Sequence, residues 1–122
     1  MIKIRPETGT DTLVVEASGK LTAKDYEDIF IPKLDQLIQQ HKKIRIVIYF
    51  TDSFDGVELG AMWEDAKFGL KHKDDVERMA IVGGPQWMAW MTKVGSHFMP
   101  GKFKVFVATA LQEAISWATQ EA

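Results

Sequence analysis

Residues 44–50 read Ile-Arg-Ile-Val-Ile-Tyr-Phe, and this run constrains the fold more than any other part of the chain. β-Branched and aromatic side chains favour strands, and a nearly continuous apolar run indicates a strand that is covered on both faces. Strands of this kind occur in parallel sheets whose faces are covered by helices. We therefore expect an α/β domain with this segment as its central strand.

Strand patterns and helical patterns alternate along the rest of the chain, separated by cap and turn residues. The expected strands are residues 1–5, 13–17, 44–50, 79–82 and 102–107. The expected helices are residues 22–38, 57–72, 86–97 and 110–120. The first two strands are expected to form a hairpin. The alternation predicts a mostly parallel sheet of about five strands with right-handed crossovers, an antiparallel edge strand and four helices.

Cap and turn signals refine these boundaries. Thr22 and Asp25 have the spacing of a capping box, with Asp in place of the usual Glu, so a helix is expected to begin there. Pro32 interrupts the helical pattern and predicts a bend or two abutting helices at this position. Gly19 is expected to close the second strand, and residues 51–56 are expected to form a loop after the central strand.

The composition limits the class of protein. A chain of 122 residues with 46% hydrophobic residues and no internal repeat is expected to form a single domain, residues 1–122. The absence of cysteine excludes disulfides, thiolate metal sites and cysteine nucleophiles, and it fits a reducing compartment. No apolar run approaches the roughly 18 residues of a membrane span, and the first residues lack the apolar core of a signal peptide. We therefore expect a cytoplasmic protein.

Tryptophan and methionine are concentrated in one part of the chain. Three of the four tryptophans and five of the six methionines lie between residues 62 and 99. This region overlaps residues 78–112, which hold four cationic residues and no carboxylate. Four cations are too few for binding by neutralisation of a nucleic-acid backbone, so no nucleic-acid partner is expected. They are compatible with contact to an anionic lipid surface.

Three stretches of the chain carry a family resemblance. They are residues 21–26 (LTAKDY), residues 54–72 (FDGVELGAMWEDAKFGLKH) and residues 78–84 (RMAIVGG), the last followed by Trp87. Through them the chain resembles the bacterial SpoIIAA-like family, which has the STAS fold of anti-sigma-factor antagonists. The resemblance implies a STAS-like α/β fold and no established activity. Related folds include the CRAL-TRIO lipid-binding domains, so it also implies, by analogy, a role in binding an apolar ligand or a membrane.

A groove between the second and third expected helices is the predicted binding site. An apolar lining with Lys67 and His72 at its rim suits an apolar small molecule or a lipid. A second stripe on the third helix is expected to contact a membrane surface or a second copy of the chain, and core packing or homodimerisation would explain the same residues. The predicted ligand-binding residues are Trp63, Lys67, Phe68, His72, Trp87, Trp90, Met91 and Phe98. The predicted membrane or dimer contacts are Met88, Lys93, Met99 and Lys102.

Ser53 supports an alternative, regulatory function through the family resemblance. It follows Asp52 in the expected loop before the second helix, where anti-sigma-factor antagonists carry a phosphorylated serine that controls docking to a protein partner. A phosphate there would face the free N–H groups of a helix N-terminus. Phe54 and Asp55 depart from the Ser-Gly-apolar-Gly pattern of the antagonists, and Asp55 would repel a phosphate. Turn and cap hydrogen bonds of Asp52 and Ser53 are the simpler explanation.

No motif in the chain indicates catalysis or a bound metal. The three histidines, His41, His72 and His97, are far apart in the sequence and match no metal-ligand spacing. The chain has no nucleophile elbow, no glycine-rich phosphate loop and no paired catalytic carboxylates in a recognisable context. We therefore expect a protein that binds without catalysis and uses no cofactor or metal.

Overall fold

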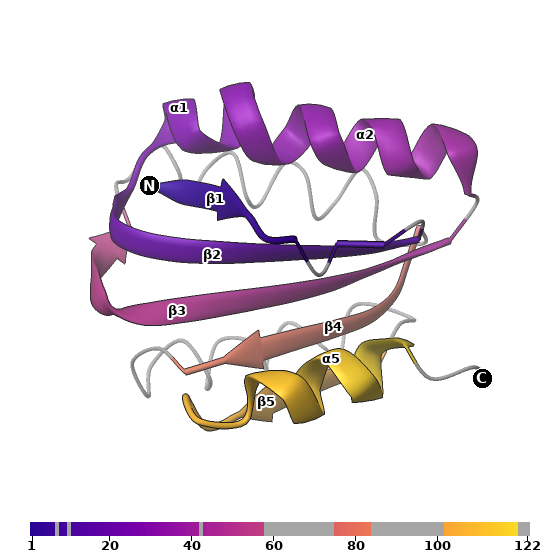
Figure 1. Ribbon diagram of the computed structural model, residues 1–122. Coiled ribbons are helices and arrows are strands. Elements are labelled where there is room, and N and C mark those ends of the chain that lie inside the picture. The colour runs from indigo at the N-terminus through magenta and orange to yellow at the C-terminus, as the bar shows by residue number, and fades with distance from the viewer. Residues whose placement is uncertain (7, 10, 42, 58–74, 84–101, 120–122) are drawn as a thin grey trace.

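The computed structural model describes residues 1–6, 8–9, 11–41, 43–57, 75–83 and 102–119 (Figure 1). Its centre is a five-stranded sheet in which the strands lie in chain order from β1 to β5. β1 is antiparallel to β2, and all other neighbouring strands are parallel. The strands are β1 (Ile2–Ile4), β2 (Thr12–Leu21), β3 (Ile44–Val57), β4 (Val76–Val82) and β5 (Lys102–Phe106). The predicted α/β sheet of five strands, mostly parallel with one antiparallel edge strand, is confirmed.

Two helical regions lie in the described part of the chain, where four helices were expected overall. The first comprises α1 (Ala23–Asp25), the π-helix η1 (Tyr26–Phe30) and α2 (Ile31–Gln40), and the second is α5 (Leu111–Thr119). In Figure 1, α2 runs along the β1 side of the sheet and α5 lies in front of β4 and β5. The helices expected at residues 57–72 and 86–97 fall outside the described residues, except that Val57 ends β3.

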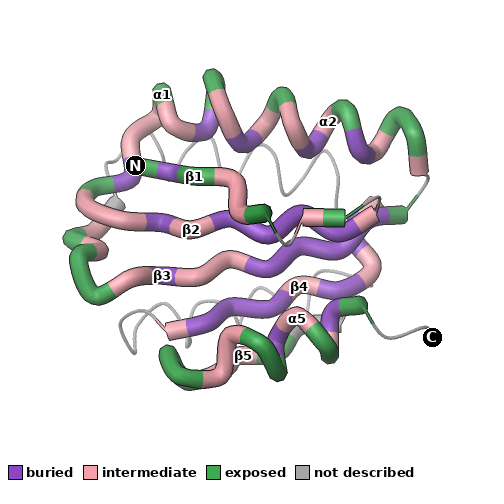
Figure 2. Tube along the Cα trace, viewed as in Figure 1, coloured by how far each residue is buried: buried purple, intermediate pink, exposed green. Residues whose placement is uncertain are grey.

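The central strand β3 is buried from both sides, as its sequence predicts. Ile46 is 1% exposed on one face and Val47 is 0% exposed on the other. Figure 2 shows buried residues along the middle of β2, β3 and β4. The first face is covered by α2, and its core includes Leu13, Val15, Leu34, Leu37, Ile44 and Ile46. The second face is covered by α5, and its core includes Val14, Val47, Ala80, Val82, Ala114 and Ala118.

Pro32 explains the change of helix type in the first helical region. A proline has no N–H, and its ring clashes with the carbonyl four residues earlier. The wider turn of η1 precedes this position, and the Ile31 N–H donates to the Tyr26 carbonyl five residues back. α2 then begins with Pro32 in its first turn, where the missing N–H costs little. The chain therefore has abutting helical segments at Pro32, one of the two predicted arrangements.

Two expected boundaries on the neighbouring strands are wrong. β2 does not close at Gly19 but continues to Leu21, and residues 51–56 continue β3 rather than forming a loop. Gly19 pairs with Phe54, and Leu21 pairs with Val57. Turn-type residues in this segment are accommodated by irregularities in the register, which insert extra residues into β3. Phe54 and its partner Gly19 are 35 residues apart in the chain, so local composition carries no signal for the pairing.

Gly83 follows β4 in a conformation that favours glycine. Its φ is 74°, and its N–H donates to the Phe106 carbonyl over 2.9 Å. A Cβ atom at this position would lie 3.0 Å from the backbone oxygen of Phe50. The chain therefore needs both the backbone freedom and the small size of glycine where β4 ends between β3 and β5.

Replacing Gly83 with Ala should lower the free energy of unfolding. The positive φ alone costs a side chain about 1–2 kcal/mol, and the contact with the Phe50 oxygen adds to that cost. Urea unfolding of both proteins measures the difference. Gly9→Ala is the matched control, because no atom lies within 4 Å of its added Cβ, and it should change stability by less than about 0.5 kcal/mol. Equal midpoints for Gly83→Ala and the parent protein would contradict the strain at this position.

Candidate functional site

Binding sites in open α/β sheets lie beyond the carboxyl ends of the parallel strands. Four parallel strands, β2 to β5, end at this edge of the sheet, which we call the carboxyl edge. Residues 58–74 directly follow β3, and residues 84–101 follow β4 after Gly83. β4 ends beside Tyr49 of β3, whereas β3 continues for eight more residues to Val57. The two chain segments that carry the predicted groove therefore follow neighbouring strands of different length at this edge.

The outer part of the carboxyl edge is built by β2 and β3 alone. The last pair between β3 and β4 is Tyr49 with Val82, whereas β3 runs on along β2 to Val57. Between Phe50 and Phe54, β3 has two more residues than the facing part of β2. Such bulges bend a strand and redirect its side chains.

The bulged segment exposes short polar side chains and anchors itself by one aromatic ring. Asp52, Ser53 and Asp55 are exposed, whereas Phe54 is half-buried. The Phe54 ring lies edge-on to the Phe50 ring, with 4.7 Å between the ring centroids. The aromatic pair holds the bulge against the core, so that a serine and two carboxylates face solvent.

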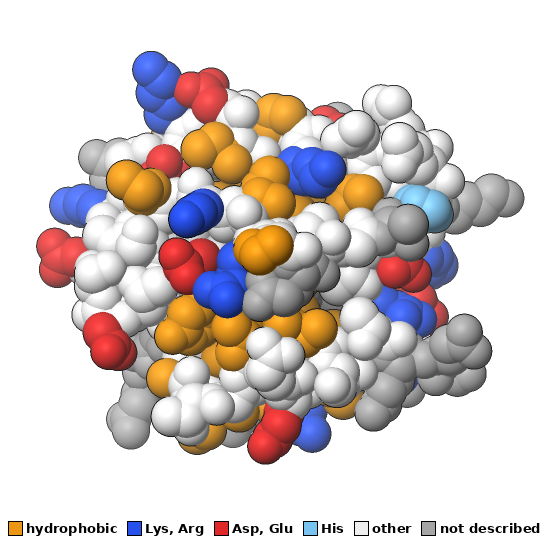
Figure 3. Space-filling view, viewed as in Figure 1, with side chains coloured by type: hydrophobic (Ala, Val, Ile, Leu, Met, Phe, Trp, Pro, Cys, Tyr) orange, Lys and Arg blue, Asp and Glu red, His pale blue; other side chains and the backbone are white. Residues whose placement is uncertain are grey.

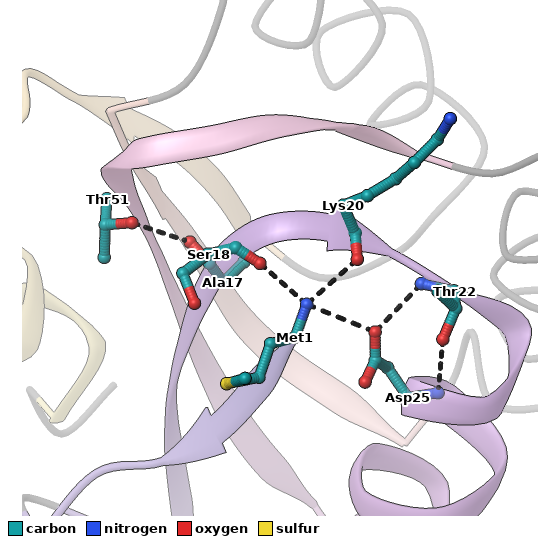
Figure 4. A network of polar contacts seen from close by, with 7 residues as sticks. All are labelled: Met1, Ala17, Ser18, Lys20, Thr22, Asp25 and Thr51. Atoms are coloured by element: carbon teal, nitrogen blue, oxygen red, sulfur yellow. Dashed lines mark hydrogen bonds and ion pairs between the residues drawn. The ribbon is translucent and has the colours of Figure 1, made fainter.

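Ser53 lies in a strand, and the expected loop position of this residue is wrong. Its Oγ is 2.9 Å from the Thr51 Oγ1. The Thr51 hydroxyl also donates to the Ala17 carbonyl over 3.4 Å, a contact drawn in Figure 4. If Thr51 donates to Ala17, Ser53 is the donor to Thr51. Ser53 is therefore accessible, but four further residues of β3 separate it from any segment that follows the strand.

A polar network joins β1, β2 and α1 at the same edge (Figure 4). The N-terminal ammonium of Met1 donates to the Ser18 carbonyl over 2.6 Å and to the Lys20 carbonyl over 2.9 Å, and it lies 3.2 Å from Asp25 Oδ2. The Thr22 N–H donates to the same carboxylate oxygen over 2.9 Å, and the Asp25 N–H donates to Thr22 Oγ1 over 3.1 Å. The predicted capping box is therefore confirmed.

The capping box controls the ionisation of Asp25. Partial burial would raise the pKa of this carboxyl by disfavouring its charged form. Hydrogen bonds from the Thr22 backbone, the N-terminal ammonium and the Thr22 side chain, together with the charge of the ammonium, outweigh burial and lower the pKa below its ordinary value. The folded state therefore stabilises the Asp25 carboxylate, and this stabilisation disappears when the group is protonated.

Most predicted site residues lie outside the described part of the chain. All eight predicted ligand-binding residues, Trp63 to Phe98, fall in residues 58–74 and 84–101, as do Met88, Lys93 and Met99. Lys102 is the first residue of β5 and is in register with Arg78 of β4. It therefore lies at the opposite end of the sheet from the carboxyl edge.

Sequence reasoning missed two buried arginines at that opposite end. Arg45 is 8% exposed and Arg78 is 5% exposed, and they are register partners on β3 and β4. Arg45 Nη2 lies 3.4 Å from Glu77 Oε2, and Arg78 Nη1 donates to the Trp117 carbonyl. An arginine within a run of apolar strand residues was the available signal, because in a strand covered on both faces it must lie beneath a helix.

Among the described residues, no three histidine, aspartate or glutamate side chains gather closely enough to hold a metal ion. None of the helices that the described residues form is long and apolar enough to cross a membrane.

Replacing Asp25 with Asn should lower stability in a pH-dependent way. The folded-state pKa of Asp25 is depressed, so its contribution is full above the unfolded pKa of about 3.9 and is lost as pH falls through the folded value. At pH 7 the variant should lose about 1 kcal/mol, and the two unfolding curves should converge below about pH 3. Asp28→Asn, at an exposed position on η1, is the control. A difference that stays constant from pH 7 to pH 2 would contradict the role of the charge.

Known proteins place this fold in a family. A search of curated proteins finds no match to the chain. Among solved structures, the chain is similar to an uncharacterized protein of the DUF3478 family from Shewanella loihica PV-4, whose crystal structure has a SpoIIAA-like fold. The two are 36% identical with a TM-score of 0.77, over 96% of this chain and 93% of that one. The sequence model of the SpoIIAA-like family matches residues 12–119, from the start of β2 to the end of α5. This protein therefore belongs to the SpoIIAA-like family.

Proposed function

We propose that this domain is a non-catalytic binding module for an apolar small molecule or a lipid. The SpoIIAA-like fold is consistent with a non-catalytic regulatory domain. One observation supports the location of the proposed site: residues 58–74 and 84–101 follow β3 and β4, two neighbouring parallel strands, at the carboxyl edge, where α/β sheets bind their ligands.

The composition of the two segments determines the proposed ligand class. They contain three tryptophans, and tryptophan suits surfaces that are partly apolar and partly wet. Methionines at Met88, Met91 and Met99 adapt to ligands of irregular shape. Lys67 and His72 would form the polar rim and attract a carboxylate or phosphate head group. An amphipathic molecule with an anionic head is therefore the proposed occupant.

The same segments support a proposal of peripheral membrane association. Met88 and Met99 would enter the head-group region, and Lys93 and Lys102 would attract anionic lipids. A homodimer that covers the methionines is the competing explanation. Membrane association requires lipid, whereas a homodimer forms without it, and the following experiment distinguishes the two.

Tryptophan quenching by a brominated lipid tests both proposals. Trp117 is the one tryptophan outside the proposed groove, and it lies in α5 beside Phe106 and Arg78. The variant Trp117→Phe therefore retains only the three tryptophans of the proposed groove. Dibromostearate should quench this variant saturably, because bromine quenches tryptophan on contact. Vesicles of brominated phosphatidylcholine with phosphatidylglycerol should quench it as well if the segments enter a membrane.

Matched variants sharpen the vesicle measurement. Lys93→Gln should lower vesicle affinity about fivefold, since each lysine near an anionic surface contributes about 1 kcal/mol. Lys24→Gln, at an exposed position on α1, should leave it unchanged. Quenching no stronger than that of free N-acetyltryptophanamide would contradict the ligand site. Quenching by dibromostearate without quenching by vesicles would contradict membrane association alone and would favour the dimer as the cover for Met88 and Met99.

Ser53 carries a second proposed function, the docking of a protein partner under control of phosphorylation. The favouring observation is that Ser53 is exposed on the bulge of β3 and its hydroxyl contacts only Thr51 among the described residues. A phosphate would add about two negative charges beside Asp52 and Asp55. It would therefore make the surface of the carboxyl edge strongly acidic, and this added negative charge would control the docking of the partner.

Phosphopeptide mass spectrometry tests this second function. The protein is incubated with ATP and an extract of the cells that produce it, and peptides covering residues 44–57 are measured. Phosphate on Ser53, with none in Ser53→Ala and an unchanged level in Thr51→Ala, is the expected result. Phosphate on Thr51 instead, or on neither hydroxyl, would contradict a switch at Ser53.

A further inference from the structure

Among the described residues, the C-terminal helix α5 contacts the sheet through two buried alanines and three half-buried side chains. Ala114 and Ala118, one turn apart, are its only residues that the structure shows as fully buried. Leu111, Ile115 and Trp117 are half-buried beside them. On the view that shows α5, hydrophobic side chains gather below the centre of the molecule next to lysine and arginine side chains (Figure 3). The two alanines let the helix backbone approach the sheet closely, but small side chains bury little apolar area.

Among the described residues, Arg78 makes a side-chain hydrogen bond to α5. Its Nη1 donates to the Trp117 carbonyl over 2.9 Å, and its Cζ lies 5.1 Å from the centre of the Trp117 ring. The last carbonyls of a helix lack partners within the helix, and a cation there also complements the helix dipole. Among the described residues, no carboxylate pairs with Arg78, and the neighbouring Glu77 lies against Arg45. One side chain from β4 therefore holds the end of α5.

The connection between β5 and α5 is exposed and sparsely bonded. Val107, Ala108 and Thr109 are exposed, and 70% of the Val107 surface is accessible to solvent. The Ala110 N–H donates to the Val107 carbonyl, which closes a single turn. Phe106, just before this connection, is tied to the sheet by the Gly83 N–H. Three exposed residues between a fixed strand and a helix are suited to absorb a change of backbone angles.

We infer that α5 opens from the sheet as a unit, about a hinge at residues 107–109, without unfolding of the sheet. The Arg78 contact to Trp117 determines how often it opens. The rest of the sheet stays covered on its other face by α2, whose Leu34 and Leu37 are buried there. Opening uncovers an apolar strip on β2, β3 and β4 together with the Arg78 guanidinium. The strip consists of Val14, Val47, Ala80 and Val82, each 0% exposed when α5 is closed.

Native-state hydrogen exchange on the full chain tests the inference. The backbone amides of residues 114–119 should exchange at least tenfold faster than those of residues 46–48 at low denaturant, and with a weaker dependence on denaturant. Faster exchange and a weaker denaturant dependence both indicate an opening that exposes less surface than global unfolding. Equal rates and equal denaturant dependence in the two segments would overturn the inference.

Two variants separate the opening of α5 from unfolding of the whole domain. Ile46→Val acts on the α2 face and should speed exchange of residues 46–48 about 3- to 10-fold, with exchange of α5 unchanged. Arg78→Gln removes a contact that only the closed state makes, so exchange of α5 should rise about 10-fold or more. If Arg78→Gln does not fold, Arg78→Lys replaces it in the same measurement, because it keeps the positive charge. Lys3→Gln, an exposed cation on β1, is the control and should change neither segment. An equal effect of Ile46→Val on α5 and on β3 would overturn the inference.

Discussion

Burial of β3 on both faces is the constraint on which the rest of the structure depends. Fully burying a valine or isoleucine side chain contributes about 1.5–3 kcal/mol, and this strand buries Ile44 and Ile46 on one side and Val47 on the other. Neither face can be left to water, and among the described elements α2 covers one side and α5 the other. The two covers differ in strength. α2 inserts leucines, whereas α5 inserts two alanines and depends on Arg78 for the contact at its end.

The parallel sheet also separates two ends with different chemistry. At the carboxyl edge, β2 and β3 extend past β4 and carry exposed hydroxyl and carboxylate groups, and the two segments with the tryptophan cluster begin there. At the amino end, Arg45 and Arg78 are buried in register and one of them holds α5. The proposed hinge of α5 follows β5 at the carboxyl edge, whereas the Arg78 contact that holds α5 lies toward the amino end.

The features that the sequence predicts correctly are those with a local cause. The run at residues 44–50, the Thr22–Asp25 capping box and the break at Pro32 each follow from neighbours within a few positions. The expected loop at residues 51–56 is wrong because its pairing with β2 is a contact between distant parts of the chain. The contact of Arg78 with Trp117 joins residues 39 positions apart, and no spacing rule covers that separation. The predicted groove residues lie outside the described part of the chain.

Native mass spectrometry of freshly purified protein tests the proposed binding function most directly. The proposal predicts a monomer or dimer peak accompanied by a heavier species, which loses one amphipathic molecule per chain on collisional activation. Gly83→Ala perturbs the end of β4, so the fraction of protein that carries this molecule should be lower in Gly83→Ala than in Gly9→Ala. A single ligand-free mass under gentle ionisation, unchanged after incubation with stearate, would contradict the binding of an apolar ligand by this domain.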